Sequence, residues 1–155
     1  MIIYPDMPDV IPIPARTKGL PWYRATWNWL TVPTFWMIAE NYEYQLIDGT
    51  RCLFPKGFRF DGASIPRAFW PLINPDGIMF LQGMIHDFAY RFGCLLRWDR
   101  SPYMQGMPQW FWDQVFYDEG NAINGMRPLN YVAWVALRGF GWIAWNNYRE
   151  RGETP

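Results

Sequence analysis

The chain has 155 residues, half of them apolar and a fifth aromatic, so one domain has enough apolar surface for a core, which excludes a disordered chain. Its fourteen basic and fourteen acidic side chains cancel. Without net charge the chain lacks the long-range field with which nucleic-acid-binding proteins attract phosphate, and we expect no nucleic-acid partner.

Proline dominates the beginning of the chain. The first 33 residues contain six prolines, at Pro5, Pro8, Pro12, Pro14, Pro21 and Pro33. Proline at this density fixes φ and removes backbone donors, which opposes long helices and central strands. We therefore expect an extended N-terminal arm at residues 1–36, followed by a single α+β globular domain at residues 37–155.

The arm also carries aromatic side chains that are too apolar to stay solvated, namely Trp22, Tyr23, Trp27 and Trp29. Such side chains pack either on the core of their own chain or on a neighbouring molecule. Both alternatives are open from the sequence.

A hairpin is predicted after the arm. Apolar and polar residues alternate from Tyr42 to Leu46, which is typical of a half-buried strand. Asp48 and Gly49 form a turn signal that favours type I′, and residues 51–54 return as the second strand. Residues 57–60 predict a further short extended segment.

Three main helices are predicted in the second half. Residues 78–92 follow Asp76, a possible N-cap, precede Gly93 and are apolar on several faces, which predicts a mostly buried helix. Residues 110–123 form the next helix, and the last begins at Pro128 and runs to about residue 149. The fold class is therefore α+β, a small antiparallel hairpin or sheet packed on about three main helices.

The last helix is nearly long enough to cross a bilayer. Arg138 lies at its middle, where an arginine costs about 2.5–3.5 kcal/mol in a membrane. We therefore expect a buried core helix and no membrane span.

Two cysteines, Cys52 and Cys94, show no metal-type CxxC spacing. They are expected to be reduced thiols of a protein made in the cytoplasm. The first ten residues show no secretory signal pattern.

Polar residues with special backbone properties cluster in FPKGFRFDGASIPRAFWPLINPDG. Gly62 and Pro66 predict a strand-to-helix corner that holds Asp61 and Ser64 in place. One interpretation is structural: Asp61 or Ser64 caps the short helix and Arg67 forms a salt bridge.

The helical sequence that follows the corner contains His86, the only histidine, and Asp87. On a helix His86 shares a face with Tyr90, whereas Asp87 points about 100° away. A single histidine on an apolar helix is more often a core residue than a catalyst. We nevertheless predict that the corner and the helix meet in one polar centre.

The motifs DGASIPRAFW and IHDFAY, the acidic position in WDQVF and the closing VAWVALRGFGWIAW resemble a phage-encoded family, domain of unknown function 1353. The resemblance covers about residues 53–145 and does not include the proline-rich arm. It implies a tailed-phage or prophage origin but no activity. The positions that match the family pattern are Asp61, Ser64, Arg67, His86, Asp87, Tyr90 and Asp113.

The first functional hypothesis is a virion protein made in the host cytoplasm, such as a small tail, baseplate or connector component. It would bind other virion proteins, or copies of itself, through the aromatic arm, because aromatic and arginine side chains are enriched at interface centres. The polar cluster would then be a buried network with Tyr90 and Asp113.

The alternative is a hydrolase acting on the bacterial cell wall. His86 would serve as general base, oriented by Asp61 or Asp87, while Ser64 or water attacks and Arg67 holds an anionic group. The GxSxG nucleophile motif is absent from the sequence, which argues against this reading.

We expect no cofactor. A metal alternative would use His86 with three carboxylates, those of Asp61, Asp87 and Asp113. With a single imidazole such a site would suit magnesium, manganese or calcium better than zinc. No standard ligand spacing supports it.

Overall fold

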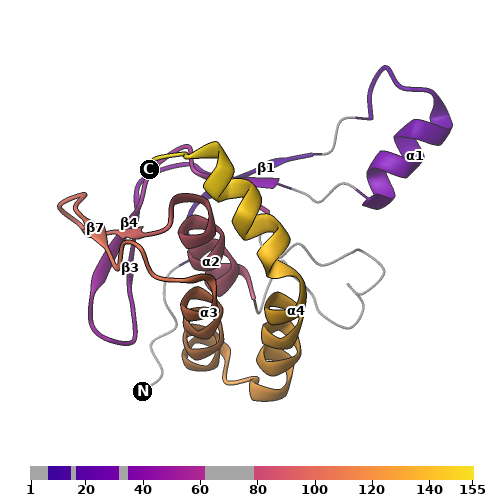
Figure 1. Cartoon of the computed structure of the whole chain (residues 1–155). Helices are drawn as coiled ribbons and strands as arrows, with labels where there is room; N and C mark the ends of the chain where they lie inside the picture. Colours follow the sequence, from indigo (N-terminus) through magenta and orange to yellow (C-terminus); the bar gives the residue numbers. More distant parts are fainter. Residues whose placement is uncertain (1–6, 15–16, 32–34, 62–78) are drawn as a thin grey trace.

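The computed structural model describes residues 7–14, 17–31, 35–61 and 79–155. Small antiparallel sheets lie beside helices (Figure 1). This arrangement confirms the expected α+β class. Asp76, the expected N-cap, falls outside the described residues.

A three-stranded sheet joins the beginning of the chain to the domain. Its order is β1 (Val10–Ile13), β2 (Phe35–Ile38) and β5 (Arg59–Phe60), and both pairs are antiparallel. Pro12 lies in β1, at the edge of the sheet, where a missing backbone N–H breaks no ladder hydrogen bond on the open side. Part of the proline-rich segment is therefore a strand of the sheet.

The predicted hairpin is confirmed as β3 (Tyr42–Gln45) and β4 (Arg51–Phe54), with Tyr44 opposite Cys52. The expected type I′ turn is wrong, because Gly49 has a φ of 85° whereas Asp48 keeps a negative φ. The carboxylate of Asp48 accepts the Thr50 N–H at 2.8 Å, which stabilises this turn with only one left-handed residue. A second hairpin, β6 (Leu95–Leu96) and β7 (Pro102–Tyr103), follows α2.

Three helices pack against one another: α2 (Phe80–Phe92), α3 (Gln109–Asn124) and α4 (Arg127–Arg151) (Figure 1). Gly93 and Gly125 end α2 and α3 in the left-handed conformation, with φ of 70° and 68°. Ten of the thirteen residues of α2 are buried. The predicted central helix is therefore confirmed.

Aromatic rings fill the core between the strands and α2. Phe58 stacks on Phe60 with ring centroids 5.8 Å apart and meets Phe88 of α2 edge-on at 4.8 Å. Phe54 meets the same Phe88 ring at 5.3 Å. Burying rings of this size stabilises the fold by about 1.5–3 kcal/mol each.

The expectation that the arm is extended is wrong for α1 (Trp22–Thr31), a helix of ten residues. Pro21 precedes the helix, where no N–H is needed, and its carbonyl accepts the Ala25 N–H at 2.9 Å. The ten residues themselves contain no proline. Helix α1 stands apart from the three packed helices (Figure 1).

The expectation that the last helix is a buried core helix is also wrong. Asn130 is the one α4 residue that is fully buried, and one whole face of α4 is exposed. Among the described helices, none combines the length and apolar character needed to cross a bilayer.

A buried carboxylate joins α3 to the β3–β4 hairpin. Glu119 accepts hydrogen bonds from the Tyr44 hydroxyl and from the Ile47 N–H, both at 2.9 Å. Burial, with the charges of Asp48 and Asp118, outweighs these bonds and raises the pKa of Glu119 above its usual 4.5. Glu119 therefore holds a proton more tightly in the folded than in the unfolded state.

Glu119→Gln should change how stability depends on pH. Because the folded pKa is raised, the contribution of Glu119 is present below pH 4.5 and is lost as the pH rises through the folded pKa. We expect the urea-unfolding free energy of the wild type to decline relative to that of the variant as the pH rises above 4.5. The exposed Glu150→Gln control should follow the wild type, and a rising difference for Glu119→Gln would contradict the assignment.

Candidate functional site

The carboxylate of Asp113 lies at the meeting point of three helices. It is completely buried on α3. Its Oδ1 lies 3.2 Å from His86 Nε2 and accepts the Tyr90 hydroxyl at 2.5 Å, and both partners belong to α2. Its Oδ2 accepts Arg138 Nη1 of α4 at 3.1 Å.

The partners of Asp113 decide its ionisation. Burial alone would raise its pKa, but the hydrogen bonds from His86 and Tyr90, with Arg138, outweigh burial and hold the pKa below its usual 3.8. Burial and the bond to Asp113 raise the pKa of the Tyr90 hydroxyl, which keeps it a proton donor. At neutral pH the centre therefore holds an ionised carboxylate that receives donors from His86, Tyr90 and Arg138.

The imidazole of His86 is held tightly. Because an ionised carboxylate can only accept, the donor in the contact with Asp113 is His86 Nε2. The ring centroid lies 3.9 Å from that of Tyr90 and 5.5 Å from that of Phe116. His86 is 5% exposed, so the described part of the site gives the imidazole little contact with solvent.

A glycine lets α4 approach this centre. A Cβ on Gly141 would lie 2.5 Å from the Tyr90 hydroxyl and 3.1 Å from Gln109 Nε2. Gln109 also reaches Asp113 Oδ2 at 3.4 Å. Only a residue without a side chain allows α4 this close, and Arg138 depends on that approach to reach Asp113.

A second contact joins Asp61 to α2, while Gly62 and Pro66 of the predicted corner lie outside the described residues. The backbone N–H of Asp61, at the end of β5, donates to Asp87 Oδ2 at 3.1 Å. Burial and the charges of Asp87 and Asp61 raise the pKa of Tyr148 of α4. This part of the predicted centre therefore lies close to both α2 and α4.

The structure groups the predicted residues into two sets. His86, Tyr90 and Asp113 meet around one carboxylate, and Asp61 meets Asp87. The carboxylate bonded to the imidazole is that of Asp113, which the sequence analysis had placed in the surrounding network. Ser64 and Arg67 lie outside the described residues, so the catalytic assignment stays a prediction.

Sequence reasoning missed Arg138 as a member of the site. Its position in an apolar helix was read only as evidence against a membrane span. The same position signals a buried partner, because an arginine among apolar residues needs an anion. Gly141 gave no comparable signal, since its role depends on the contact with another helix.

The arrangement of the described residues does not support the metal alternative. Among them, no group of three or more histidine, cysteine, aspartate or glutamate side chains is placed to hold a metal ion. The thiols of Cys52 and Cys94 are buried and unpaired, and burial raises the pKa of Cys52 to about 12.

Residues 36–137 match the family described as "Protein of unknown function (DUF1353)". The match covers more than half of the chain, so the chain belongs to this family. It includes the Asp61–Asp87 and His86–Asp113 contacts but not α1, which ends before it begins. No curated protein and no solved structure was found to match the chain.

Two glycines of α4 should respond oppositely to alanine. Gly141→Ala forces a methyl group against the Tyr90 hydroxyl and should destabilise the protein by about 1–3 kcal/mol. Gly139→Ala, two residues away, meets no atom within 4 Å and should stabilise the helix by about 0.5–1 kcal/mol. Urea unfolding at low protein concentration measures both, and equal effects would contradict the close contact.

Asp113→Asn should remove a pH-dependent stabilisation. Because the folded pKa is lowered, the contribution of Asp113 is present above pH 3.8 and is lost as the pH falls through the folded pKa. We expect the variant to be less stable than the wild type by about 1–3 kcal/mol at neutral pH, and the difference to shrink below pH 3.8. The exposed Asp9→Asn serves as control. A difference independent of pH would show that the lowered pKa is wrong.

Proposed function

We propose that this protein is a virion-associated structural protein of a tailed phage, a small tail, baseplate or connector component, which binds neighbouring virion proteins through α1. The observation that carries the proposal is the exposure of large aromatic rings on α1. Trp22 is 81%, Tyr23 55% and Trp27 67% exposed. The side chain of Trp29, expected among them, lies outside the described part of the chain.

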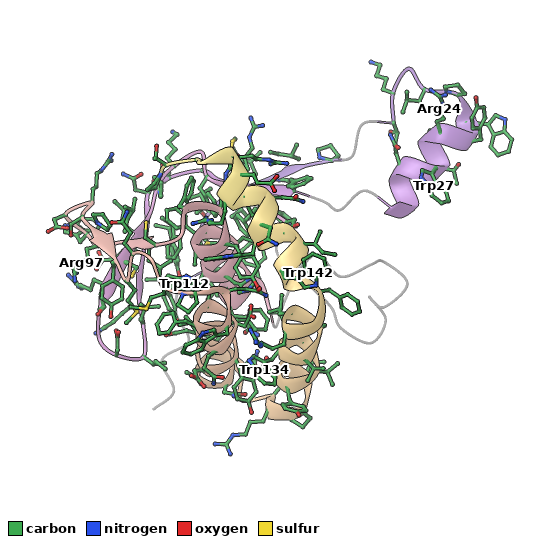
Figure 2. All side chains as sticks on the ribbon, in the orientation of Figure 1. Arg24, Trp27, Arg97, Trp112, Trp134 and Trp142 are labelled. Carbon is green, nitrogen blue, oxygen red and sulfur yellow. The ribbon has the colours of Figure 1, made fainter. Side chains whose placement is uncertain are left out.

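Aromatic surface of this extent favours a partner. Soluble monomers rarely expose large contiguous apolar patches, and tryptophan, tyrosine and arginine are the side chains that contribute most at interface centres. Trp27 and Arg24 both belong to α1, which stands apart from the packed helices (Figure 2). The helix is thus placed where another protein can reach it.

A concave surface beside α1 supports the same conclusion. It encloses about 590 Å³ and is lined by Leu20, Tyr23, Arg24, Trp27 and Asn28. Its apolar walls suit an inserted apolar side chain, and the Arg24 guanidinium suits a carbonyl or carboxylate next to it. A segment of another protein can supply both the apolar side chain and the carbonyl or carboxylate.

The hydrolase alternative has one observation in its favour. The Asp113 carboxylate fixes His86 in the way that a carboxylate orients a catalytic imidazole. The same contacts also enclose the ring, and a general base needs access to substrate. We therefore infer that this centre serves the stability of the helix packing, with no cofactor, while binding occurs on the surface.

Phage carrying substitutions in α1 test the proposal. We expect Trp22→Ser with Trp27→Ser to lower the copy number of the protein in purified virions at least about tenfold, because hot-spot aromatics contribute about 2 kcal/mol or more each. Quantitative mass spectrometry of particles measures the copy number. Trp98→Ser, which removes an exposed tryptophan from the β6–β7 hairpin, is the matched control.

The His86→Gln variant distinguishes the structural role from the hydrolase alternative. Normal particles and normal infectivity with this variant are expected, provided that its circular dichroism shows a folded protein. Fully assembled particles that fail to infect would favour the hydrolase. Absence of the wild-type protein from virions would overturn the structural role.

A further inference from the structure

A cavity of about 150 Å³ lies between α3 and the two hairpins, β3–β4 and β6–β7. Most of its wall is apolar. Leu46 and Leu95 are buried and form its floor, whereas Ile47 and Asp48 are exposed and lie at its rim. The cavity therefore opens to solvent above a buried apolar floor.

Three carboxyl groups of this cavity have no positive partner. Asp48, Asp118 and Glu119 line it, and in the part of the chain that the structure describes none of them forms an ion pair. Arg97 of the second hairpin lies over the Tyr103 ring, 5.0 Å from its centroid, and does not line the cavity. Burial, followed by the charges of Asp48 and Asp118, raises the pKa of Glu119. The carboxyl groups thus repel one another and favour a cation.

Trp112 adds a hydrogen-bond donor that has no acceptor. It lines the same cavity and is 1% exposed, and its indole Nε1 finds no partner among the described residues. Trp112, labelled in Figure 2, is seven residues from Glu119 and so lies on the same side of α3, the side that contacts Tyr44 of the hairpin. A buried N–H without an acceptor is destabilising. An acceptor that enters the cavity would remove this cost.

These features define the ligand by three groups: a cation for the carboxyl groups, an acceptor for the indole N–H and an apolar group for the walls. A cavity of about 150 Å³ holds a molecule the size of benzene. The amino nitrogen, Cα and side chain of an N-terminal leucine match this size. The first residue of a polypeptide carries all three groups, because its ammonium group, apolar side chain and carbonyl share one Cα.

We propose that this cavity binds the free N-terminus of another polypeptide whose first residue is apolar. The ammonium group has three N–H donors and binds the carboxyl groups of Asp118 and Glu119. The carbonyl of the first residue accepts the Trp112 indole N–H. The apolar side chain packs against Leu95 and Val115.

The charge of the cavity selects a polypeptide over a free amino acid. A free amino acid would place its α-carboxylate beside three carboxyl groups, and like charges repel. In a polypeptide the same position is a neutral carbonyl. A lysine side chain supplies an ammonium group and an apolar stem, but it has no acceptor next to the ammonium group for the indole N–H.

Titration of the full chain with small peptides tests the site. We expect leucyl-glycyl-glycine amide to bind with a dissociation constant on the order of 1 mM, as suits a ligand of this size. The acetylated peptide and free leucine should bind at least about tenfold more weakly, because charge-assisted hydrogen bonds are the stronger ones. Isothermal titration calorimetry measures the affinities.

Three outcomes of these titrations would overturn the proposal. The first is no saturable binding of the peptide up to about 10 mM. The second is equal binding of the acetylated peptide, because the cation would then have no role. The third is tighter binding of Nα-acetyl-lysine amide, which would assign the site to a lysine side chain.

Asp118→Asn locates the binding. Removing this charge should weaken the peptide about two- to fivefold, the range of partly exposed ion pairs. Glu150→Gln is the control, because it removes an exposed carboxylate from α4. In ¹H–¹⁵N spectra the indole signal that is missing from Trp112→Phe should move downfield when the wild type binds the peptide. Equal effects of the two acid variants, or an unmoved indole signal, would contradict the site.

The carbonyl contact has its own test. 3-Methylbutylamine is leucine amide without its carboxamide group, and it should bind the wild type about threefold or more weakly than leucine amide does. In Trp112→Phe this difference should disappear, because the donor is gone. A difference that persists in the folded variant would refute the contact. If the variant does not fold, the acetylated peptide and Asp118→Asn still decide the proposal on folded protein.

This site is independent of the proposed role of α1. Trp22→Ser with Trp27→Ser changes only α1 and should leave peptide binding unchanged. Absence of the protein from virions would overturn the structural role and leave the peptide site intact. Lack of peptide binding would overturn the site and leave the role of α1 intact.

Discussion

The arrangement of the three packed helices depends on the ionised carboxylate of Asp113. A buried anion is costly unless donors surround it, and here the donors come from α2 and α4 while the anion belongs to α3. Displacing α2 removes the donors His86 and Tyr90, and displacing α4 removes the guanidinium of Arg138. The centre therefore fixes the relative positions of α2, α3 and α4 more precisely than apolar packing alone, and the close approach at Gly141 is part of the same requirement.

The interior of the protein and its surface differ in the kind of side chains that they use for contacts. The interior uses polar groups with defined partners, including an amide cluster in which Gln82 binds Asn130 at 2.8 Å and Asn130 binds Asn121 at 2.9 Å. Many of the exposed apolar side chains lie instead on α1 and on one side of α4. Polar contacts thus order the packing of α2, α3 and α4, and the larger exposed apolar side chains of α1 and α4 lie away from these contacts.

Local signals in the sequence predicted the helices and the first hairpin well. Gly93, Gly125 and Pro128 mark helix ends because their backbone preferences act within a few residues. Helix α1 was missed because proline was counted over a whole segment, although residues 22–31 contain none. The site was harder to predict. Three aspartates were possible partners of His86, and the choice depends on the packing of α2 against α3, which no local pattern encodes.

Helix α1 follows β1 and precedes β2, and these two strands pair with each other. The helix is therefore an insertion within a hairpin, tethered to the sheet on both sides, and not the tip of a loose tail. A single proteolytic nick on either side of α1 would leave it linked covalently through the other side, while the β1–β2 hydrogen bonds hold the severed strand in place. Complete release requires a cut on each side, which protects an exposed aromatic segment from loss.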